Sequence, residues 1–141
     1  MNLTIREITR LLKGQLILGD PKGTVRRAEI DSRRISHGDA FFALKGDKKD
    51  GHDYVMTACR AGATAVVVSH LKWLQSSQGF TAGIIQVKNP MESLQLMGQV
   101  IRNGFKGNVV GITGSNGKTT TKQMLAEILH KTGPGLHTSR R

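Results

Sequence analysis

Residues 108–131 read NVVGITGSNGKTTTKQMLAEILHK, and this stretch decides most of what the sequence predicts. It opens with an apolar, β-branched segment, passes through a glycine-containing loop at 114–117, and continues into a segment with apolar residues at helical spacing. The apolar residues of that last segment share one face of the expected helix: Met124, Leu125, Ile128 and Leu129. The stretch therefore predicts a strand, a glycine loop and an amphipathic helix, which is the context of a P-loop.

The glycine loop carries groups that suit the phosphates of a nucleotide. Backbone N–H groups around residues 114–118 can surround a phosphate at the positive end of the helix, and glycines leave room for that approach. Lys118 offers an ammonium for the terminal phosphates, and the Thr119 hydroxyl is placed to ligate the Mg²⁺ that bridges them. We therefore predict nucleotide binding, with ATP and Mg²⁺ as the cofactors.

The loop departs from the strict pattern G-x-x-x-x-G-K-[ST], because Ile112 stands five positions before Gly117. GSNGKTT is therefore a variant of the motif. The alternative is a solvated Gly/Asn turn that merely precedes a helix. The position of GKTT between a β-branched segment and an amphipathic helix favours the nucleotide-binding interpretation.

Two helices in the first part of the chain are predicted from their capping residues. Residues 4–7 have capping-box spacing before an apolar periodic segment, so we expect a helix over 5–13 that Gly14 closes. The sequence Asn-Pro-Met-Glu at 89–92 places an N-cap before a proline at the first helical position, which predicts a helix over 90–102.

The other apolar segments predict the strands of an α/β layer. A helix ending on glycine is expected over residues 52–62, directly before a β-branched run of the fully buried kind. The charged segment KGDKKDGH at 45–52 is predicted to be a loop too polar to pack. The expected extended segments are QLILG (15–19), TVRRAEID (24–31), AFFALKG (40–46), ATAVVVS (63–69) and GIIQV (83–87).

A junction between two domains is expected at residues 103–108, NGFKGN, and we place the boundary near Lys106. We therefore predict an α/β protein with a small α/β domain over 1–106 and the first strand, P-loop and helix of a second domain over 107–141. Cys59 is the single cysteine, so it cannot form an internal disulfide or a multi-cysteine zinc site, and its small neighbours predict a buried position.

The charge of the chain suggests polyanionic partners, but its distribution argues against them. The 141 residues carry 21 Lys or Arg against 10 Asp or Glu, a net charge of +11. The basic residues of 54–141 are scattered, and aromatic residues that could stack on bases make up only 4%. We expect no nucleic-acid partner, with a basic nucleic-acid binder as the open alternative. No apolar run approaches about 20 residues and no secretory leader is visible, so we expect no membrane insertion and a cytoplasmic location.

Two regions together resemble the Mur ligase family, which builds the peptide stem of the bacterial cell wall. ITGSNGKTTTK at 112–122 is similar to the ATP loop of these ligases and of their folylpolyglutamate synthetase relatives. Residues 30–68 resemble the uridine-nucleotide-binding domain of the two members that act late in the pathway, through DSR, G-D-x-F-F-A-L-x-G, D-G-H and A-x-x-x-G-A. The resemblance covers residues 1 to 132, and Ser115 and Lys122 favour the member that adds a dipeptide.

The resemblance implies an amide-forming ligase of peptidoglycan precursor synthesis. ATP would phosphorylate the terminal carboxylate of UDP-N-acetylmuramoyl-tripeptide, and the amine of D-Ala-D-Ala would attack the acyl phosphate. Lys118 would stabilise the transferring phosphoryl group as the catalytic residue, and Thr119 would hold magnesium. The implied ATP-binding residues are Thr113, Gly114, Ser115, Asn116, Gly117, Lys118, Thr119 and Thr120.

The same resemblance implies that the substrate's uridine diphosphate contacts Ser32, Arg33, Asp50, Gly51 and His52. A guanidinium and a hydroxyl suit an anionic, polar ligand. The alternative is structural: Asp31 caps a turn, and His52 caps the helix that follows it.

Members of the family have three domains, and the resemblance implies that only the first is whole here. GLHTSRR at 135–141 starts like the family's next strand and ends in two arginines where an asparagine-containing motif is expected. We therefore expect a truncated, monomeric chain that is inactive alone. A non-catalytic uridine-nucleotide-binding module with an incomplete P-loop is the alternative function.

Overall fold

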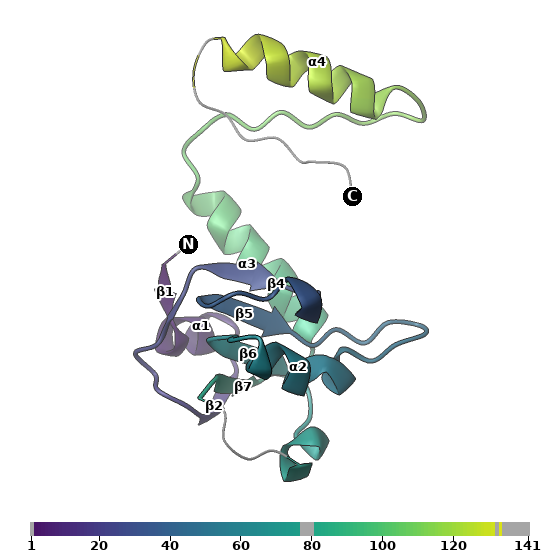
Figure 1. The fold of residues 1–141 in the computed structure, drawn as a ribbon. Coiled ribbons are helices and arrows are strands. Elements are labelled where there is room, and N and C mark those ends of the chain that lie inside the picture. Colours follow the sequence, from purple (N-terminus) through teal and green to yellow (C-terminus); the bar gives the residue numbers. More distant parts are fainter. Residues whose placement is uncertain (1, 77–80, 132, 134–141) are drawn as a thin grey trace. The chain divides into compact units, whose positions relative to one another are not determined.

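The computed structural model describes residues 2–76, 81–131 and 133 (Figure 1). The expected strand start at 135–141 lies outside the described residues. The chain divides into two compact units, Met1–Phe105 and Lys106–Arg141, and each is described by itself. No helix in the described part of the chain is both long and apolar enough to cross a bilayer.

The first unit contains a five-stranded sheet of order β2-β7-β6-β5-β4. Its strands are β2 (Gln15–Leu18), β4 (Arg27–Glu29), β5 (Asp39–Phe42), β6 (Ala65–Val68) and β7 (Gly83–Gln86). β4 to β7 run parallel to one another, and only β2 is antiparallel to its neighbour β7. A separate pair joins β1 (Leu3–Thr4) to β3 (Thr24–Val25).

The two extended segments predicted after the first helix do not pair with each other. QLILG forms β2 at one edge of the sheet, whereas TVRRAEID divides into β3 and the opposite edge strand β4. The chain therefore crosses from one edge to the other between residues 19 and 26, and the pairing of β3 with β1 lies on this crossing.

The core lies on both faces of the sheet because alternate residues of a strand point to opposite sides. Phe42 and Val67 pack with residues of the first and third helices, while Phe41 and Val66 pack against the second helix. All four residues of β6 are buried, as the β-branched run predicted. Cys59 is also buried, and burial raises the pKa of its thiol to about 11, so the prediction of a packing role is confirmed.

The capped helices form as predicted, with shifted ends. α1 (Ile5–Leu11) begins with a capping box in which the side chains of Thr4 and Glu7 each accept from the other's backbone N–H. The helix ends earlier than predicted, and Lys13 rather than Gly14 adopts the left-handed conformation, with φ 51°. α3 (Pro90–Gly104) has Asn89 as its N-cap and runs two residues further than predicted.

The predicted helix over 52–62 is divided in two. A 3-10 turn, η2 (Gly51–Tyr54), leads into α2 (Val55–Arg60), and Gly62 beyond it has φ 96°, as expected for a helix that closes on glycine. Two further 3-10 turns lie in the described part of the first unit, η1 (Ser32–Arg34) and η3 (Lys72–Ser76).

The second unit contains α4 (Lys118–His130), which confirms the predicted helix. The strand predicted over 108–113 is not formed, because a strand requires a neighbour and no pairing partner exists among residues 106–131 and 133. On the apolar face of α4, Met124 is 60% exposed and Ile128 is 61% exposed.

Candidate functional site

The parallel strands bring the predicted substrate-binding residues toward one edge of the sheet. β4, β5 and β6 run in the same direction, so their carboxyl ends lie at the same end of the sheet, which we call its carboxyl edge. η1 follows β4, the loop to η2 follows β5, and Ser69 and His70 follow β6. Ligands of parallel α/β sheets bind outside this edge. The topology therefore places Ser32 and Arg33 at the same edge as Asp50, Gly51 and His52.

The turn that contains the DSR element is organised by Asp31. Its carboxylate accepts from the backbone N–H of Arg33 at 3.1 Å and caps η1. The same carboxylate accepts from Arg33 Nε at 2.9 Å and from an Arg33 terminal nitrogen at 2.7 Å. These bonds hold the pKa of Asp31 well below its usual range and raise the pKa of Arg33. The capping role considered for Asp31 is confirmed, and the Arg33 side chain, 85% exposed, is presented to solvent.

In the DGH loop an aspartate again caps a 3-10 turn and contacts the side chain two residues later, but here that side chain is buried. Asp50 caps η2, accepting from the His52 backbone N–H at 2.9 Å, and lies 2.6 Å from His52 Nδ1. The Ser69 backbone N–H can only donate, so His52 Nε2 accepts from it at 2.9 Å and Nδ1 carries the proton directed at Asp50. The Ser69 hydroxyl lies 3.1 Å from the same Nε2.

These contacts correct two expectations about the loop. His52 does not cap the helix that follows it: His52 lies inside η2, which Asp50 caps, and the N-cap of α2 is Tyr54, without a side-chain hydrogen bond. The segment 45–52 is not wholly unpacked either, since His52 is only 4% exposed and both of its ring nitrogens are engaged. Burial of an imidazole is possible here because Asp50 and Ser69 satisfy its two nitrogens.

Gly51 is required by close packing. Its N–H donates to the Leu44 carbonyl at 2.8 Å, and a Cβ at this position would lie 2.6 Å from Leu44 N and 2.7 Å from Leu44 O. His52, oriented by Asp50, therefore joins the loop after β5 to the end of β6, and Gly51 packs inside that loop against Leu44.

Ser69 and His70 belong to this edge and were not singled out from the sequence. The rings of His52 and His70 stack with centroids 4.0 Å apart and planes 17° apart. His70 Nδ1 is buried without a hydrogen-bond partner among the described residues. Desolvation and the nearby His52 lower the pKa of His70. Polar residues placed directly after a buried strand were the signal that could have indicated them.

The cluster of Asp50, His52 and His70 has side-chain ligand atoms within 4.8 Å of one another, which raises the question of a metal. Imidazole binds a metal in the plane of its ring, and a metal cannot lie in the planes of two stacked, nearly parallel rings at once. Both His52 nitrogens are also engaged in hydrogen bonds. We therefore assign no metal to this cluster.

The glycine loop of the second unit has the local geometry that phosphate binding requires. Gly117 is the N-cap of α4 with φ 74°, and no side chain caps the first turn of the helix. Lys118 Nζ donates to the Gly114 carbonyl and lies 3.4 Å from the Ser115 carbonyl oxygen. The loop residues predicted to bind ATP are exposed, with Thr119 partly buried. The first-turn N–H groups, the ammonium and the Thr119 hydroxyl together fit a nucleotide phosphate with Mg²⁺.

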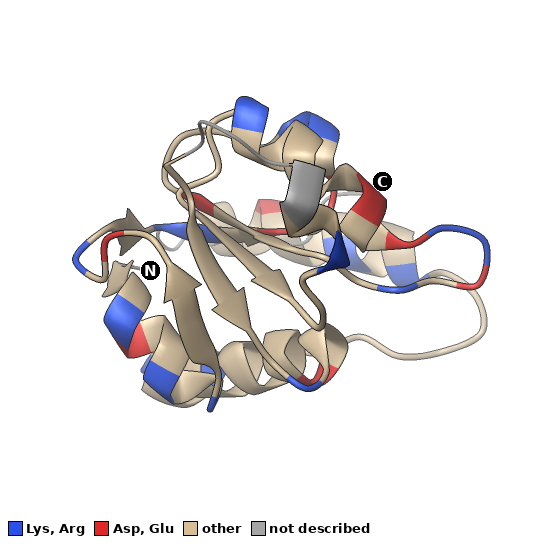
Figure 2. Cartoon of the chain, turned by 90° about the horizontal axis from the view of Figure 1, so that it is seen from below, with Lys and Arg blue, Asp and Glu red and all other residues tan. Residues whose placement is uncertain are grey.

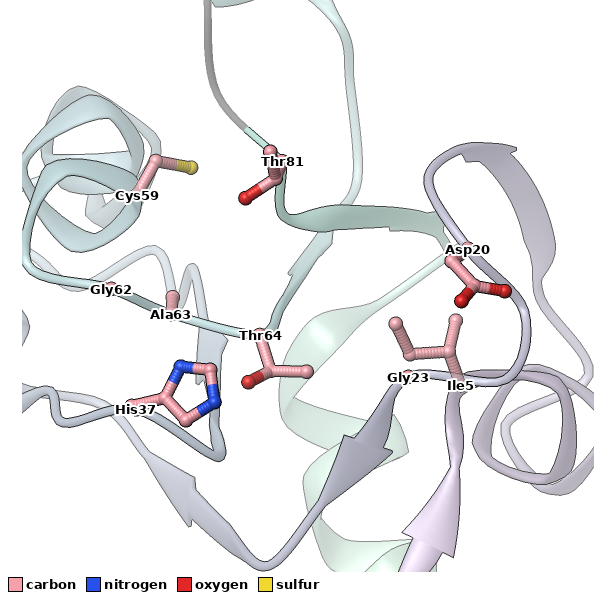
Figure 3. Close-up of a pocket in the computed structure, with 9 residues that line it drawn as sticks. All are labelled: Ile5, Asp20, Gly23, His37, Cys59, Gly62, Ala63, Thr64 and Thr81. Carbon is pink, nitrogen blue, oxygen red and sulfur yellow. The ribbon is translucent and has the colours of Figure 1, made fainter.

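A cavity of about 200 Å³ lies next to the amino ends of β5, β6 and β7, at the end of the sheet opposite the carboxyl edge (Figure 3). The predicted site residues do not line it. Its polar lining includes Asp20, His37, Thr64 and Thr81. The Thr64 hydroxyl is already engaged, accepting from the Gly38 N–H at 3.0 Å.

Comparison with known proteins decides the family. A family model described as the catalytic domain of the Mur ligase family matches residues 24–132. The chain belongs to the Mur ligase family. Both the DGH loop and the glycine loop of the chain fall inside the matched region.

Relatives of two activities are similar to this chain. A UDP-N-acetylmuramoyl-L-alanyl-D-glutamate--2,6-diaminopimelate ligase from Clostridium perfringens is 34% identical over 132 residues, which cover 87% of this chain and 26% of the relative. A UDP-N-acetylmuramoyl-tripeptide--D-alanyl-D-alanine ligase from Haemophilus influenzae is 33% identical over 132 residues, covering 94% and 28%. The chain thus spans about a quarter of the length of these curated relatives.

Solved structures agree with this placement. MurF from Acinetobacter baumannii superimposes with a TM-score of 0.77 at 29% identity, covering 95% of this chain and 29% of the solved chain. MurF ligase from Thermotoga maritima in complex with ADP gives a TM-score of 0.57 at 36% identity, covering 76% and 24%. The α/β fold of this chain is therefore that of solved family members.

Proposed function

We propose that the chain supplies the ATP loop and the uridine-diphosphate site of a ligase that joins D-Ala-D-Ala to UDP-N-acetylmuramoyl-tripeptide. The observation that carries the proposal is the presence, in one Mur ligase chain, of a lysine-bearing glycine loop at the start of α4 and an exposed, carboxylate-held arginine at the carboxyl edge of the sheet. The ADP complex of the Thermotoga maritima relative supports ATP as the nucleotide.

Activation of the tripeptide carboxylate is the first step that we propose. A carboxylate oxygen attacks the γ-phosphorus of ATP, an acyl phosphate forms and ADP leaves. The Lys118 ammonium exchanges its contacts with the Gly114 and Ser115 carbonyls for phosphate oxygens, and so stabilises the charge of the transferring group. Mg²⁺, when bound, would neutralise phosphate charge, and Thr119 is the residue of this chain that would hold it.

Amide formation is the second step. The amine of D-Ala-D-Ala attacks the acyl carbon, the bond between carbon and phosphate oxygen breaks, and inorganic phosphate leaves while the amine loses a proton. Activation as an acyl phosphate turns a poor leaving group into a good one. Besides Lys118, the loop residues that would hold ATP are Thr113, Gly114, Ser115, Asn116, Gly117, Thr119 and Thr120.

Arg33 is the residue that we propose to meet the diphosphate of the substrate. A guanidinium has five N–H donors, and Asp31 engages only the Nε side of the group. The remaining donors face solvent and can bind phosphate oxygens. Ser32 begins the same turn, and Asp50, Gly51 and His52 hold the neighbouring loop in place.

We also propose that the units Met1–Phe105 and Lys106–Arg141 correspond to the predicted domains 1–106 and 107–141. The chain is proposed to be monomeric and to lie in the cytoplasm. Lys and Arg are interspersed with Asp and Glu over several helices and loops (Figure 2), which favours this proposal over a nucleic-acid binder.

Nucleotide titrations of the 141-residue chain test both sites, and each variant serves as the control for the other. We expect Lys118→Ala to weaken Mg·ATP binding by about tenfold or more and to leave UDP binding unchanged, and Arg33→Ala to do the reverse. Calorimetry measures both affinities. ATP affinity that is insensitive to Lys118→Ala would contradict the proposed ATP loop. UDP binding without any ATP binding would favour the non-catalytic uridine-nucleotide-binding module.

A further inference from the structure

A buried carboxylate lies directly before the turn that carries Arg33. Glu29 is the last residue of β4 and is only 5% exposed. Its Oε1 accepts from the backbone N–H groups of Ile30 at 2.9 Å and Asp31 at 3.1 Å, and its Oε2 lies 3.8 Å from Arg34 Nε. Buried carboxylates need such partners, and those of Glu29 all belong to the turn that follows it.

Glu29 and Asp31 act in series on Arg33. Glu29 fixes the backbone at Asp31, and the Asp31 carboxylate then holds the Arg33 guanidinium through two side-chain hydrogen bonds. An exposed arginine samples many rotamers unless its guanidinium is held. The position of the Asp31 carboxylate therefore determines where Arg33 is presented.

A second buried carboxylate of the same sheet offers a comparison away from this turn. Asp39 accepts from Arg27 Nε at 3.1 Å, from an Arg27 terminal nitrogen at 2.6 Å and from the Ser36 N–H at 2.8 Å. It stands at the start of β5 and joins two adjacent strands in register. Asp39 is thus a matched carboxylate, equally buried and arginine-bound, at the edge of the sheet away from Arg33.

We propose that Glu29 is a positioning residue for diphosphate recognition, which it serves by fixing the turn from which Arg33 extends. This inference rests on the proposed function, because it assigns Arg33 to the diphosphate. The hydrogen-bond acceptor at the distance of Glu29 Oε1 carries the effect rather than the charge. Loss of the positioning weakens contacts to phosphate and leaves contacts to the nucleoside intact.

Two conservative variants separate the position of the hydrogen-bond acceptor at residue 29 from its negative charge. Glu29→Gln keeps an oxygen at the same distance and loses the charge, whereas Glu29→Asp keeps the charge and withdraws it by about 1.5 Å. Affinities of the full chain for UDP and for uridine are measured by NMR titration, with Asp39→Asn as the control. We expect Glu29→Asp to weaken UDP binding about tenfold with uridine binding unchanged, and Glu29→Gln and Asp39→Asn to stay within about threefold of the parent chain.

The outcomes distinguish this inference from the proposed function. If Arg33→Ala weakens UDP binding and Glu29→Asp does not, the positioning role is wrong and the substrate site stands. Equal losses of UDP and uridine affinity in Glu29→Asp would also overturn the positioning role, since they indicate general damage to the domain. If the parent chain does not bind UDP, or if Arg33→Ala has no effect, the proposed substrate site itself fails.

Discussion

His52 Nε2 accepts a hydrogen bond from the backbone N–H of Ser69 at 2.9 Å, and this bond joins the loop after β5 to the end of β6. The imidazole is oriented by Asp50 on its other side. A side chain of the expected substrate loop is therefore an internal tie between two neighbouring strand ends, and its removal affects the stability of the first unit.

Replacement of His52 by alanine is expected to lower the free energy of unfolding by about 3 kcal/mol, because it leaves the Ser69 N–H unpaired and opens a cavity. Urea unfolding measures the change. His37→Ala is the control, since His37 is exposed, and a change of less than about 0.5 kcal/mol is expected there. Equal effects of the two variants would show that the hydrogen bond between Ser69 and His52 does not specifically stabilise the first unit.

Stability is expected to fall as the pH drops from about 7 to about 5, because the pKa of His70 lies below its ordinary value of 6.5 in the folded state. In this range the unfolded chain binds more protons than the folded chain, so acid favours unfolding. The charged or titratable groups that act on His70 are His52, Asp50, Lys72 and Lys45. His70→Asn is expected to flatten the pH dependence measured by denaturant unfolding, and an unchanged slope would contradict this assignment.

Acid has a second effect at lower pH through Asp50, whose pKa is lowered by its bonds to the His52 backbone N–H and ring. A carboxyl with a lowered folded-state pKa stabilises the fold above its unfolded value of about 3.9 and loses that contribution as the pH falls through the folded-state pKa. Asp50→Asn is therefore expected to remove part of the pH dependence below about pH 4. Unfolding midpoints at pH 3 and pH 6 measure it.

Two glycine-to-alanine variants are expected to change stability in opposite directions. At Gly51 the added Cβ meets the Leu44 backbone at 2.6 Å, so we expect a loss of about 2 kcal/mol or more. At Gly98, inside α3, the Cβ meets nothing within 4 Å, so we expect a gain of about 0.5 to 1 kcal/mol from helix propensity. Thermal unfolding compares the two, and a tolerated Gly51→Ala would contradict the close packing described for the DGH loop.

Gly117→Ala is expected to weaken ATP binding about fivefold, because a left-handed conformation costs a non-glycine residue about 1 kcal/mol. Gly111→Ala is the matched control in the same segment, since its Cβ would also lie in open space and its backbone φ is not positive. Fluorescence titration with a labelled ATP analogue measures both variants. Equal affinities would show that the conformation of Gly117 is not needed for nucleotide binding.

Local signals predicted most of the helices and the central strands. The buried run at 65–68, the capping box at Thr4 and the N-cap at Asn89 depend on neighbouring residues, so the sequence contains the information directly. The opposite placement of β2 and β4 depends on long-range pairing, which periodicity does not encode. The strand expected over 108–113 is not formed for a related reason: strand propensity is local, whereas pairing needs a second strand, and the described residues of this unit contain none.

The candidate site divides in the same way. The glycine loop was predicted from its residue types and spacing, whereas Arg33 was implied by the family resemblance, and their roles in binding ATP and substrate stay predictions. The roles of Glu29, Ser69 and His70 were not predicted, since each depends on which atoms the fold brings within reach. The burial of His52 could not be predicted either. Both Arg33 and His52 have an aspartate two residues earlier that contacts their side chain, yet Arg33 is exposed and His52 is buried.

The exposure of α4 has a consequence for how the chain can be assayed. None of the 13 residues of α4 is buried in the described structure, and a helix of that length gains little stability when its side chains are exposed. We therefore expect a cooperative melting curve of the chain to measure the unfolding of the sheet and helices up to Phe105, and its midpoint not to change when the nucleotide loop is altered. Variants of Gly117 and Lys118 are therefore expected to keep the melting temperature of the parent chain whether or not they bind ATP. For the unit Lys106–Arg141, nucleotide binding has to be measured directly.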